Sequence, residues 1–176
     1  VREKKIEGIK EIRDELRAKG YSFQSSSDTE VVLYALIEWK EKALLKFNGM
    51  FALSFWDKKE KNLLLARDRY GIKPLYYSHN ENGITFGSEI KSILAKPDQV
   101  RAVDEEALFH YLSFLATPAP LTLFKGIKKL AAGTLARINI SGEIKIKHWL
   151  DVWDDTSPID NLDQDKICAE LISNLN

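Results

Sequence analysis

The chain has 176 residues, of which 44% are hydrophobic and 30% are charged, and its 26 basic and 26 acidic residues cancel. This composition is typical of a single globular domain and gives no net charge that would attract nucleic acid or an anionic membrane, so we expect neither as a partner. No apolar run approaches the roughly 20 residues of a membrane span, and no apolar signal sequence follows the first basic residues, so we expect a cytoplasmic protein.

Two helices are predicted first. Ile9, Ile12 and Leu16 fall on one side of a helix that ends near Gly20, and the Lys, Arg and Glu residues between them form its solvent-facing side. A second helix is expected to begin at Ser27, because Ser27-Asp28-Thr29-Glu30 has the spacing of a capping box. Its apolar residues predict that it continues into the mid-forties.

Short strands rich in aromatic and aliphatic residues come next, separated by turn residues such as Tyr70-Gly71. Their predicted ranges are 50–57, 62–67, 74–79 and 84–88. Because parallel neighbours need a crossover of about a dozen residues or more, strands this closely spaced predict an antiparallel meander.

The following residues are expected to form helices over 89–94 and 104–115 and a final hairpin over 134–140 and 143–149. The helix over 104–115 carries its apolar residues, among them Ala107, Leu112 and Leu115, on one side. Helices before and after an antiparallel block predict an α+β fold.

The C-terminal part differs from the rest. Residues 151–165 are acidic and loop-like and predict a linker, after which a last helix carries apolar residues that have no partner in this chain. We therefore expect a domain over 1–150 and a linker with one helix over 151–176. The only cysteine, Cys168, excludes an internal disulfide and a cysteine-rich metal cluster, and we predict that it is a buried packing residue of this helix.

Motifs in the middle of the chain carry a resemblance to a known family. They are Ser27-Asp28-Thr29-Glu30-Val31, Asn48-Gly49-Met50-Phe51-Ala52, Phe86-Gly87-Ser88-Glu89-Ile90-Lys91 and the long run from Ala66-Arg67-Asp68-Arg69-Tyr70-Gly71 to Tyr77. In their order along the chain they resemble the glutaminase domain, a class II amidotransferase domain, of glutamine-hydrolysing asparagine synthetases. The resemblance implies a four-layer αββα sandwich with antiparallel sheets, the N-terminal-nucleophile amidohydrolase fold, incomplete here at the N-terminus.

The resemblance also implies a chemistry, in which glutamine is hydrolysed and the ammonia passes to a synthetase domain that makes asparagine from aspartate with ATP. We expect ATP and Mg²⁺ only in that absent domain, and no cofactor or metal in this chain. The family nucleophile is a cysteine at the mature N-terminus, whereas this chain begins at Val1. Its oxyanion motif aligns with Glu3 to Gly8, where Glu3 replaces an asparagine donor. We therefore expect a chain cut at both ends, with no catalytic residue and no glutaminase activity of its own.

Asp28 is the main candidate for substrate binding. The family match implies that its carboxylate binds the α-ammonium group of glutamine. The same carboxylate also stabilises a helix N-terminus, by about 0.3–1 kcal/mol, and the two roles are compatible. Ser26 and Ser27 are further candidates for glutamine binding, although capping alone explains Ser27.

Other polar groups are interpreted as scaffold. Arg67, Asp68, Arg69 and Lys73 surround a turn and are predicted to form a network that fastens two strands, without a chemical role. The histidines have neither metal-ligand spacing nor a nucleophile partner.

Two alternatives remain open at this point. One is a non-catalytic binding or regulatory module of the same fold, and the other is a class II amidotransferase that acts on sugars or phosphoribosyl groups. In the main interpretation the partners are glutamine and the synthetase domain. We also expect self-association into a homo-oligomer, because unpaired strand edges and apolar patches favour pairing with another chain.

Overall fold

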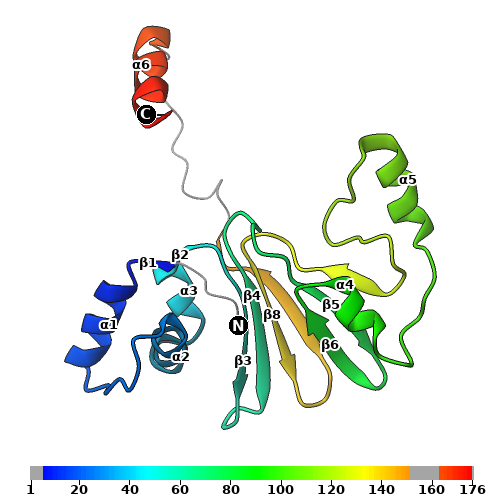
Figure 1. The fold of residues 1–176 in the computed structure, drawn as a ribbon, viewed down its shortest axis with the longest axis horizontal. Coiled ribbons are helices and arrows are strands. Elements are labelled where there is room, and N and C mark those ends of the chain that lie inside the picture. Colours follow the sequence, from blue (N-terminus) through cyan, green and yellow to red (C-terminus); the bar gives the residue numbers. More distant parts are fainter. Residues whose placement is uncertain (1–5, 151–162, 176) are drawn as a thin grey trace.

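A computed structural model of the chain describes residues 6–150 and 163–175 (Figure 1). The helices are α1 (Ile9–Ala18), α2 (Asp28–Trp39), the 3-10 helix η1 (Lys40–Lys42), α3 (Ala43–Lys46), α4 (Ile90–Leu94), α5 (Glu105–Phe114) and α6 (Gln164–Leu175). The strands are β1 (Ile6–Glu7), β2 (Asn48–Gly49), β3 (Ala52–Asp57), β4 (Asn62–Arg67), β5 (Tyr76–Asn80), β6 (Gly83–Gly87), β7 (Ile127–Lys129), β8 (Thr134–Asn139) and β9 (Ile144–His148).

The strands form two main antiparallel sheets, so the predicted α+β class is confirmed. The large sheet has the order β3-β4-β8-β9, the small sheet has the order β6-β5-β7, and β1 pairs with β2 separately. The predicted single meander is wrong, because β4 pairs with β8 and not with β5. After β4 the chain leaves the large sheet and enters the small one.

The connection between the two sheets is fixed by the polar groups at the end of β4. The Arg67 guanidinium donates to the carbonyl oxygens of Lys73 at 2.7 Å and Leu130 at 2.6 Å, and to that of Gly71. The Asp68 carboxylate accepts from the backbone N–H groups of Phe51, Ile72 and Lys73, at 2.9–3.1 Å. The predicted network thus holds for Arg67 and Asp68, which fasten the sheet-to-sheet connection through backbone groups. Lys73 takes part only with its own backbone, and Arg69 lies outside this network, because it donates to the carbonyl oxygen of Leu45.

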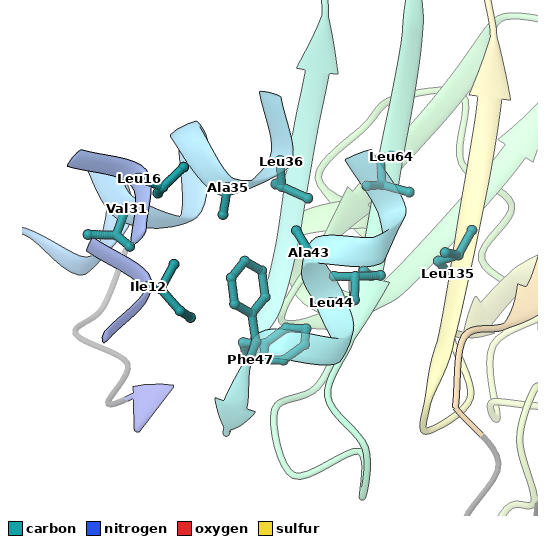
Figure 2. Close-up of a cluster of buried hydrophobic side chains, with 12 residues drawn as sticks. Ile12, Leu16, Val31, Ala35, Leu36, Ala43, Leu44, Phe47, Leu64 and Leu135 are labelled. Atoms are coloured by element: carbon teal, nitrogen blue, oxygen red, sulfur yellow. The ribbon is translucent and has the colours of Figure 1, made fainter. Parts of the chain in front are cut away.

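The helices α1, α2 and α3 cover one face of the large sheet, and the small sheet and α4 lie on its other side (Figure 1). Between helices and sheet lies a core that includes Leu16, Leu44 and Phe47, each with no exposed surface (Figure 2). Side chains of β4 alternate: Leu64 packs in this core, and Leu65 packs in a second core between the sheets. The layers therefore follow from the period of two in a β-strand.

The second predicted helix is shorter than expected. It ends at Trp39, and Lys40 follows with a positive φ of 55°, a conformation that a regular helix cannot contain. The chain bends there into η1 and α3, so that Ala43 and Leu44 reach the core. The apolar content of this segment is thus explained by two helices at an angle.

Helix α5 forms where expected, and of its residues only Ala107 is buried, whereas Leu112 and the following Leu115 are 72% and 80% exposed. Helix α6 is confirmed as a helix, yet Cys168 is exposed, so its predicted burial is wrong. The predicted linker falls largely on residues 151–162, outside the described residues. Among the described helices, none is long and apolar enough to cross a membrane.

Candidate functional site

Asp28 is the first residue of α2, and the residue before it caps the helix. Ser27 has an extended backbone conformation, with φ −66° and ψ 138°, and its Oγ accepts from the backbone N–H of Thr29 at 3.2 Å. A serine at this position satisfies one of the helix N–H groups that have no partner within the helix. The start of the second helix is therefore where the sequence predicts it.

The predicted capping box forms only in part, because Glu30 does not bond to the N–H of Ser27. Its carboxylate instead accepts from the backbone N–H groups of Gln24 at 2.9 Å and Ser25 at 2.8 Å, and from Ser25 Oγ at 2.7 Å. These hydrogen bonds, first that from the Gln24 amide, lower the pKa of Glu30 from its ordinary value, and the charge of Arg13 acts in the same direction. Glu30 thus holds the loop that precedes α2.

The opposite side of this loop is held by α1. Arg13 donates from one guanidinium nitrogen to the carbonyl oxygen of Ser25 at 2.8 Å and from another to that of Ser27 at 3.1 Å. Its guanidinium carbon also lies 4.5 Å from the ring centroid of Phe23, a cation–π contact. The residues that lead to Asp28 are therefore bonded to both neighbouring helices.

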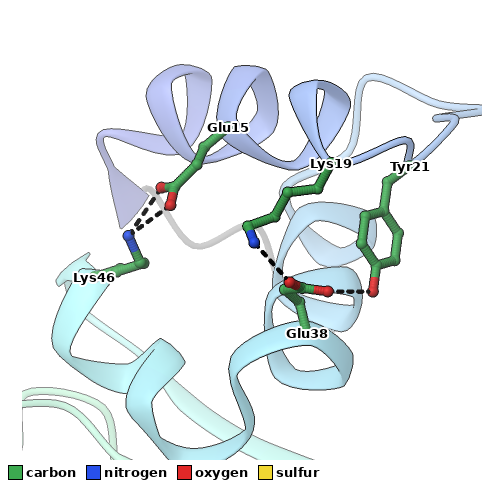
Figure 3. A network of polar contacts seen from close by, with 5 residues as sticks. All are labelled: Glu15, Lys19, Tyr21, Glu38 and Lys46. Atoms are coloured by element: carbon green, nitrogen blue, oxygen red, sulfur yellow. Dashed lines mark hydrogen bonds and ion pairs between the residues drawn. The ribbon is translucent and has the colours of Figure 1, made fainter.

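A second group of polar contacts fixes α1 against α2 and α3 (Figure 3). Lys19 pairs with Glu38 at 2.9 Å, the Tyr21 hydroxyl donates to Glu38 at 3.0 Å, and Lys46 pairs with Glu15 at 2.8 Å. The hydrogen bond from Lys19 is the first cause that lowers the pKa of Glu38. These contacts set the position of the helix that carries Arg13.

Asp28 itself is half-buried. Within residues 6–150 and 163–175, its carboxylate takes part in no hydrogen bond and no ion pair. A half-buried carboxylate without a partner in the first turn of a helix is able to accept a cationic group that approaches from solvent.

The three residues predicted to bind substrate do not line one pocket. Ser26 borders a surface hollow of about 370 Å³, which is formed between Arg13, Arg17 and the loop, but Asp28 does not line it. Ser27 uses its hydroxyl oxygen in the helix cap. The roles of Asp28, Ser26 and Ser27 toward a substrate stay predictions.

Arg13 and Glu30 were missed as site residues by reasoning from sequence. Arg13 was interpreted as part of the solvent-facing side of a helix, and Glu30 as a capping-box residue. The sequence signal for Glu30 was present, since serines at 25, 26 and 27 offer several donors ahead of the cap. Nothing in the sequence indicated Arg13.

Other reactive side chains are not assembled into a second site. In the described part of the chain, no group of three or more His, Cys, Asp or Glu residues is placed to hold a metal ion. His79 and His148 are exposed, and Cys168 lies exposed on α6.

Comparison with known proteins adds to this picture. Residues 5–150 match the family model of the glutamine amidotransferase domain. The chain is 37% identical over 174 residues to asparagine synthetase (glutamine-hydrolyzing) 3 of Bacillus subtilis strain 168, which covers 94% of this chain and 28% of that protein. It is 39% identical over 161 residues to asparagine synthetase (glutamine-hydrolyzing) 1 of the same strain, and this match covers 92% of this chain and 25% of that protein.

Solved structures show the same fold. The glutamine phosphoribosylpyrophosphate amidotransferase of B. subtilis, complexed with ADP and GMP, superposes with a TM-score of 0.56 at 18% identity, over 84% of this chain and 28% of that one. A structure described as the allosteric regulatory enzyme of purine biosynthesis gives a TM-score of 0.57, also at 18% identity, over 84% and 27%. The chain thus spans between 25% and 28% of the length of these two curated relatives and two structures.

Proposed function

This chain belongs to the family of glutamine amidotransferase domains, and we propose that it binds glutamine as a source of nitrogen for the synthesis of asparagine. The choice of acceptor rests on similarity. The two curated relatives at 37% and 39% identity are named asparagine synthetases, whereas the two solved structures described above are only 18% identical. The acceptor would then be aspartate, and the reaction would use ATP and Mg²⁺ in a synthetase domain.

We further propose that Asp28 binds the α-ammonium group of glutamine. The observation that carries this role is the half-buried carboxylate of Asp28, which has no partner among the residues that the structure describes and is presented by a helix whose preceding loop is bonded on two sides. A charge-assisted hydrogen bond is worth about 1.5–3 kcal/mol, which is roughly a factor of 10 to 150 in affinity. Ser26 and Ser27 are secondary candidates next to it.

Hydrolysis of the side-chain amide requires a nucleophile, a base and donors for the oxyanion. The resemblance implies an N-terminal cysteine whose own α-amine is the base. Cys168 does not match this role, because it lies within the peptide chain and is exposed on α6. We therefore assign to these residues the binding of glutamine and not the bond-breaking step.

The experiment uses the product of the complete gene that encodes these residues. Asparagine formation is measured with glutamine and, separately, with ammonium as the nitrogen source. Asp28→Asn is expected to raise the KM for glutamine by roughly 10-fold or more, because one charge-assisted contact is lost, and to leave the ammonium-dependent reaction unchanged.

A matched control removes a comparable charge elsewhere. Glu106 lies exposed in the first turn of α5, so Glu106→Gln also removes one carboxylate from a helix N-terminus. This variant is expected to keep the KM of the unmodified protein. An unchanged KM in Asp28→Asn refutes the role of Asp28, and the absence of asparagine with either nitrogen source refutes the proposed acceptor.

A further inference from the structure

We propose that Arg13 and Glu30 are paired positioning residues that hold the loop 24–27 from its two sides and thereby fix the orientation of Asp28. This inference rests on the proposed function of Asp28. Neither residue is proposed to contact glutamine.

The division of the loop's backbone groups between the two side chains supports this proposal. Arg13, a cation on α1, binds the carbonyl oxygens of Ser25 and Ser27. Glu30, an anion on α2, binds the N–H groups of Gln24 and Ser25. Each charge meets the backbone dipole of opposite sign, which is the arrangement that makes such hydrogen bonds short and strong.

Ser25 lies at the centre of this arrangement. Its N–H and its hydroxyl both donate to Glu30, at 2.8 and 2.7 Å, and its carbonyl accepts from Arg13 at 2.8 Å. Its Oγ also accepts from the N–H of Ser27 at 3.2 Å. Every polar group of Ser25 is therefore bonded, and the bonds run to α1, to α2 and to the helix cap.

Apart from these bonds, the segment is held by Phe23, which packs against the edge of the core. Ser22, Gln24, Ser25, Ser26 and Ser27 are all exposed, and Phe23 is the apolar side chain among them. Phe23 packs edge-on against Tyr34, with ring centroids 5.2 Å apart, and lies beneath Arg13. Removing the Arg13 side chain would thus leave two carbonyl groups of the loop without this donor and would remove the cation from one face of the Phe23 ring. Both changes would lie next to Ser27, the residue that caps the helix of Asp28.

The chain offers a matched control in Arg17, one helical turn after Arg13 on α1. Its guanidinium lies 5.8 Å from the same Phe23 ring, and it pairs with Asp14 at 3.3 Å on its own helix. Within the described residues, no hydrogen bond joins Arg17 to the backbone of the loop. Arg17→Ala therefore removes an arginine of the same helix without removing the two bonds at issue.

The test measures glutamine kinetics and amide hydrogen exchange in the complete gene product. Arg13→Ala and Glu30→Ala are expected to raise the KM for glutamine by about 2- to 10-fold, the equivalent of one net hydrogen bond, with kcat unchanged. Exchange of the Gln24 and Ser25 amides is expected to become faster in both variants. Arg13→Lys should not restore the KM, because one ammonium cannot reproduce the fork that spans two carbonyls. Arg17→Ala should change neither quantity.

A double variant separates positioning from direct contact. If Arg13 acts through Asp28, Arg13→Ala in the background of Asp28→Asn adds no further increase in KM. A full additional increase would show that Arg13 contacts the substrate, and it would overturn the proposal.

Failure of the proposed function can be distinguished from failure of the positioning role of Arg13 and Glu30. An unchanged KM in Asp28→Asn alone would reject the role of Asp28, and with it the kinetic part of this inference. The loop-holding part is judged by hydrogen exchange, and it is overturned if Arg13→Ala and Arg17→Ala exchange alike at residues 24 and 25.

Discussion

Replacing Arg67 by methionine is expected to destabilise the domain by about 2–6 kcal/mol, although Arg67 makes no ion pair in the described residues. The guanidinium satisfies three carbonyl oxygens. That of Leu130 is bonded in buried surroundings and would bear the full cost of an unsatisfied group, about 1–3 kcal/mol. Those of Gly71 and Lys73 are part-buried, so water partly replaces the lost donor, and each would cost about half as much.

The assay is urea unfolding followed by tryptophan fluorescence, with the free energy extrapolated to water. Trp149 is a suitable reporter because its indole N–H donates to the carbonyl oxygen of Arg67 at 3.1 Å. The control is Arg69→Met, since Arg69 donates one exposed bond, to the carbonyl oxygen of Leu45 at 3.1 Å, and should cost about 1 kcal/mol or less. Equal losses in the two variants would refute the reasoning, because burial and the number of carbonyls would then not determine the cost.

Five further outcomes are expected. Cys168 is exposed and should therefore react with a thiol reagent without denaturant. The 176-residue polypeptide should release no glutamate from glutamine, and glutamate release that Cys168→Ala abolishes would contradict this second expectation. The folded state lowers the pKa of Glu30, so the contribution of Glu30 to stability is present above the ordinary value of 4.5 and is lost as the pH falls through the lower folded value. Glu30→Gln should therefore flatten the acid side of a plot of the free energy of unfolding against pH. An unchanged acid side would count against the hydrogen bonds described for Glu30. Ser27→Ala should cost about 1 kcal/mol in urea unfolding, and no loss would mean that the cap is replaceable by water. Light scattering at micromolar concentration should detect an assembly larger than a monomer, because Leu112 and Phe114 are 72% and 73% exposed on α5. Leu112→Glu should weaken this assembly. A monodisperse monomer would refute self-association through this helix.

Short stretches of sequence are sufficient to predict those elements that are determined by residues close together in the chain. The start of α2 follows from Ser27, whose side chain caps the helix as the motif predicts. The final hairpin of β8 and β9 follows from its alternating residues and its short turn. Both depend on interactions between residues close in the chain, which a short window of sequence contains.

Features that depend on distant residues were not predictable in this way. Strand spacing alone suggested that β4 and β5 are neighbours, yet the bond from Arg67 to Leu130 spans 63 positions and helps to send the chain into another sheet. Strand β7 was not predicted, because its sequence of one isoleucine and two lysines carries no alternating pattern. The site was similarly incomplete, since the role of Arg13 depends on carbonyl groups 12 and 14 residues away.

Strand β4 connects the helical layer to the second sheet through a single run of consecutive side chains. Leu64 and Ala66 are buried beneath the helices, and Leu65 is buried toward the small sheet, so the two cores share one backbone segment. A slip of one residue in the pairing of β4 would turn each of these side chains toward the wrong layer at once. The two halves of the sandwich are therefore expected to unfold together in one cooperative transition. The segment that presents Asp28 is then expected to unfold at the same temperature as strands on the far side of the molecule.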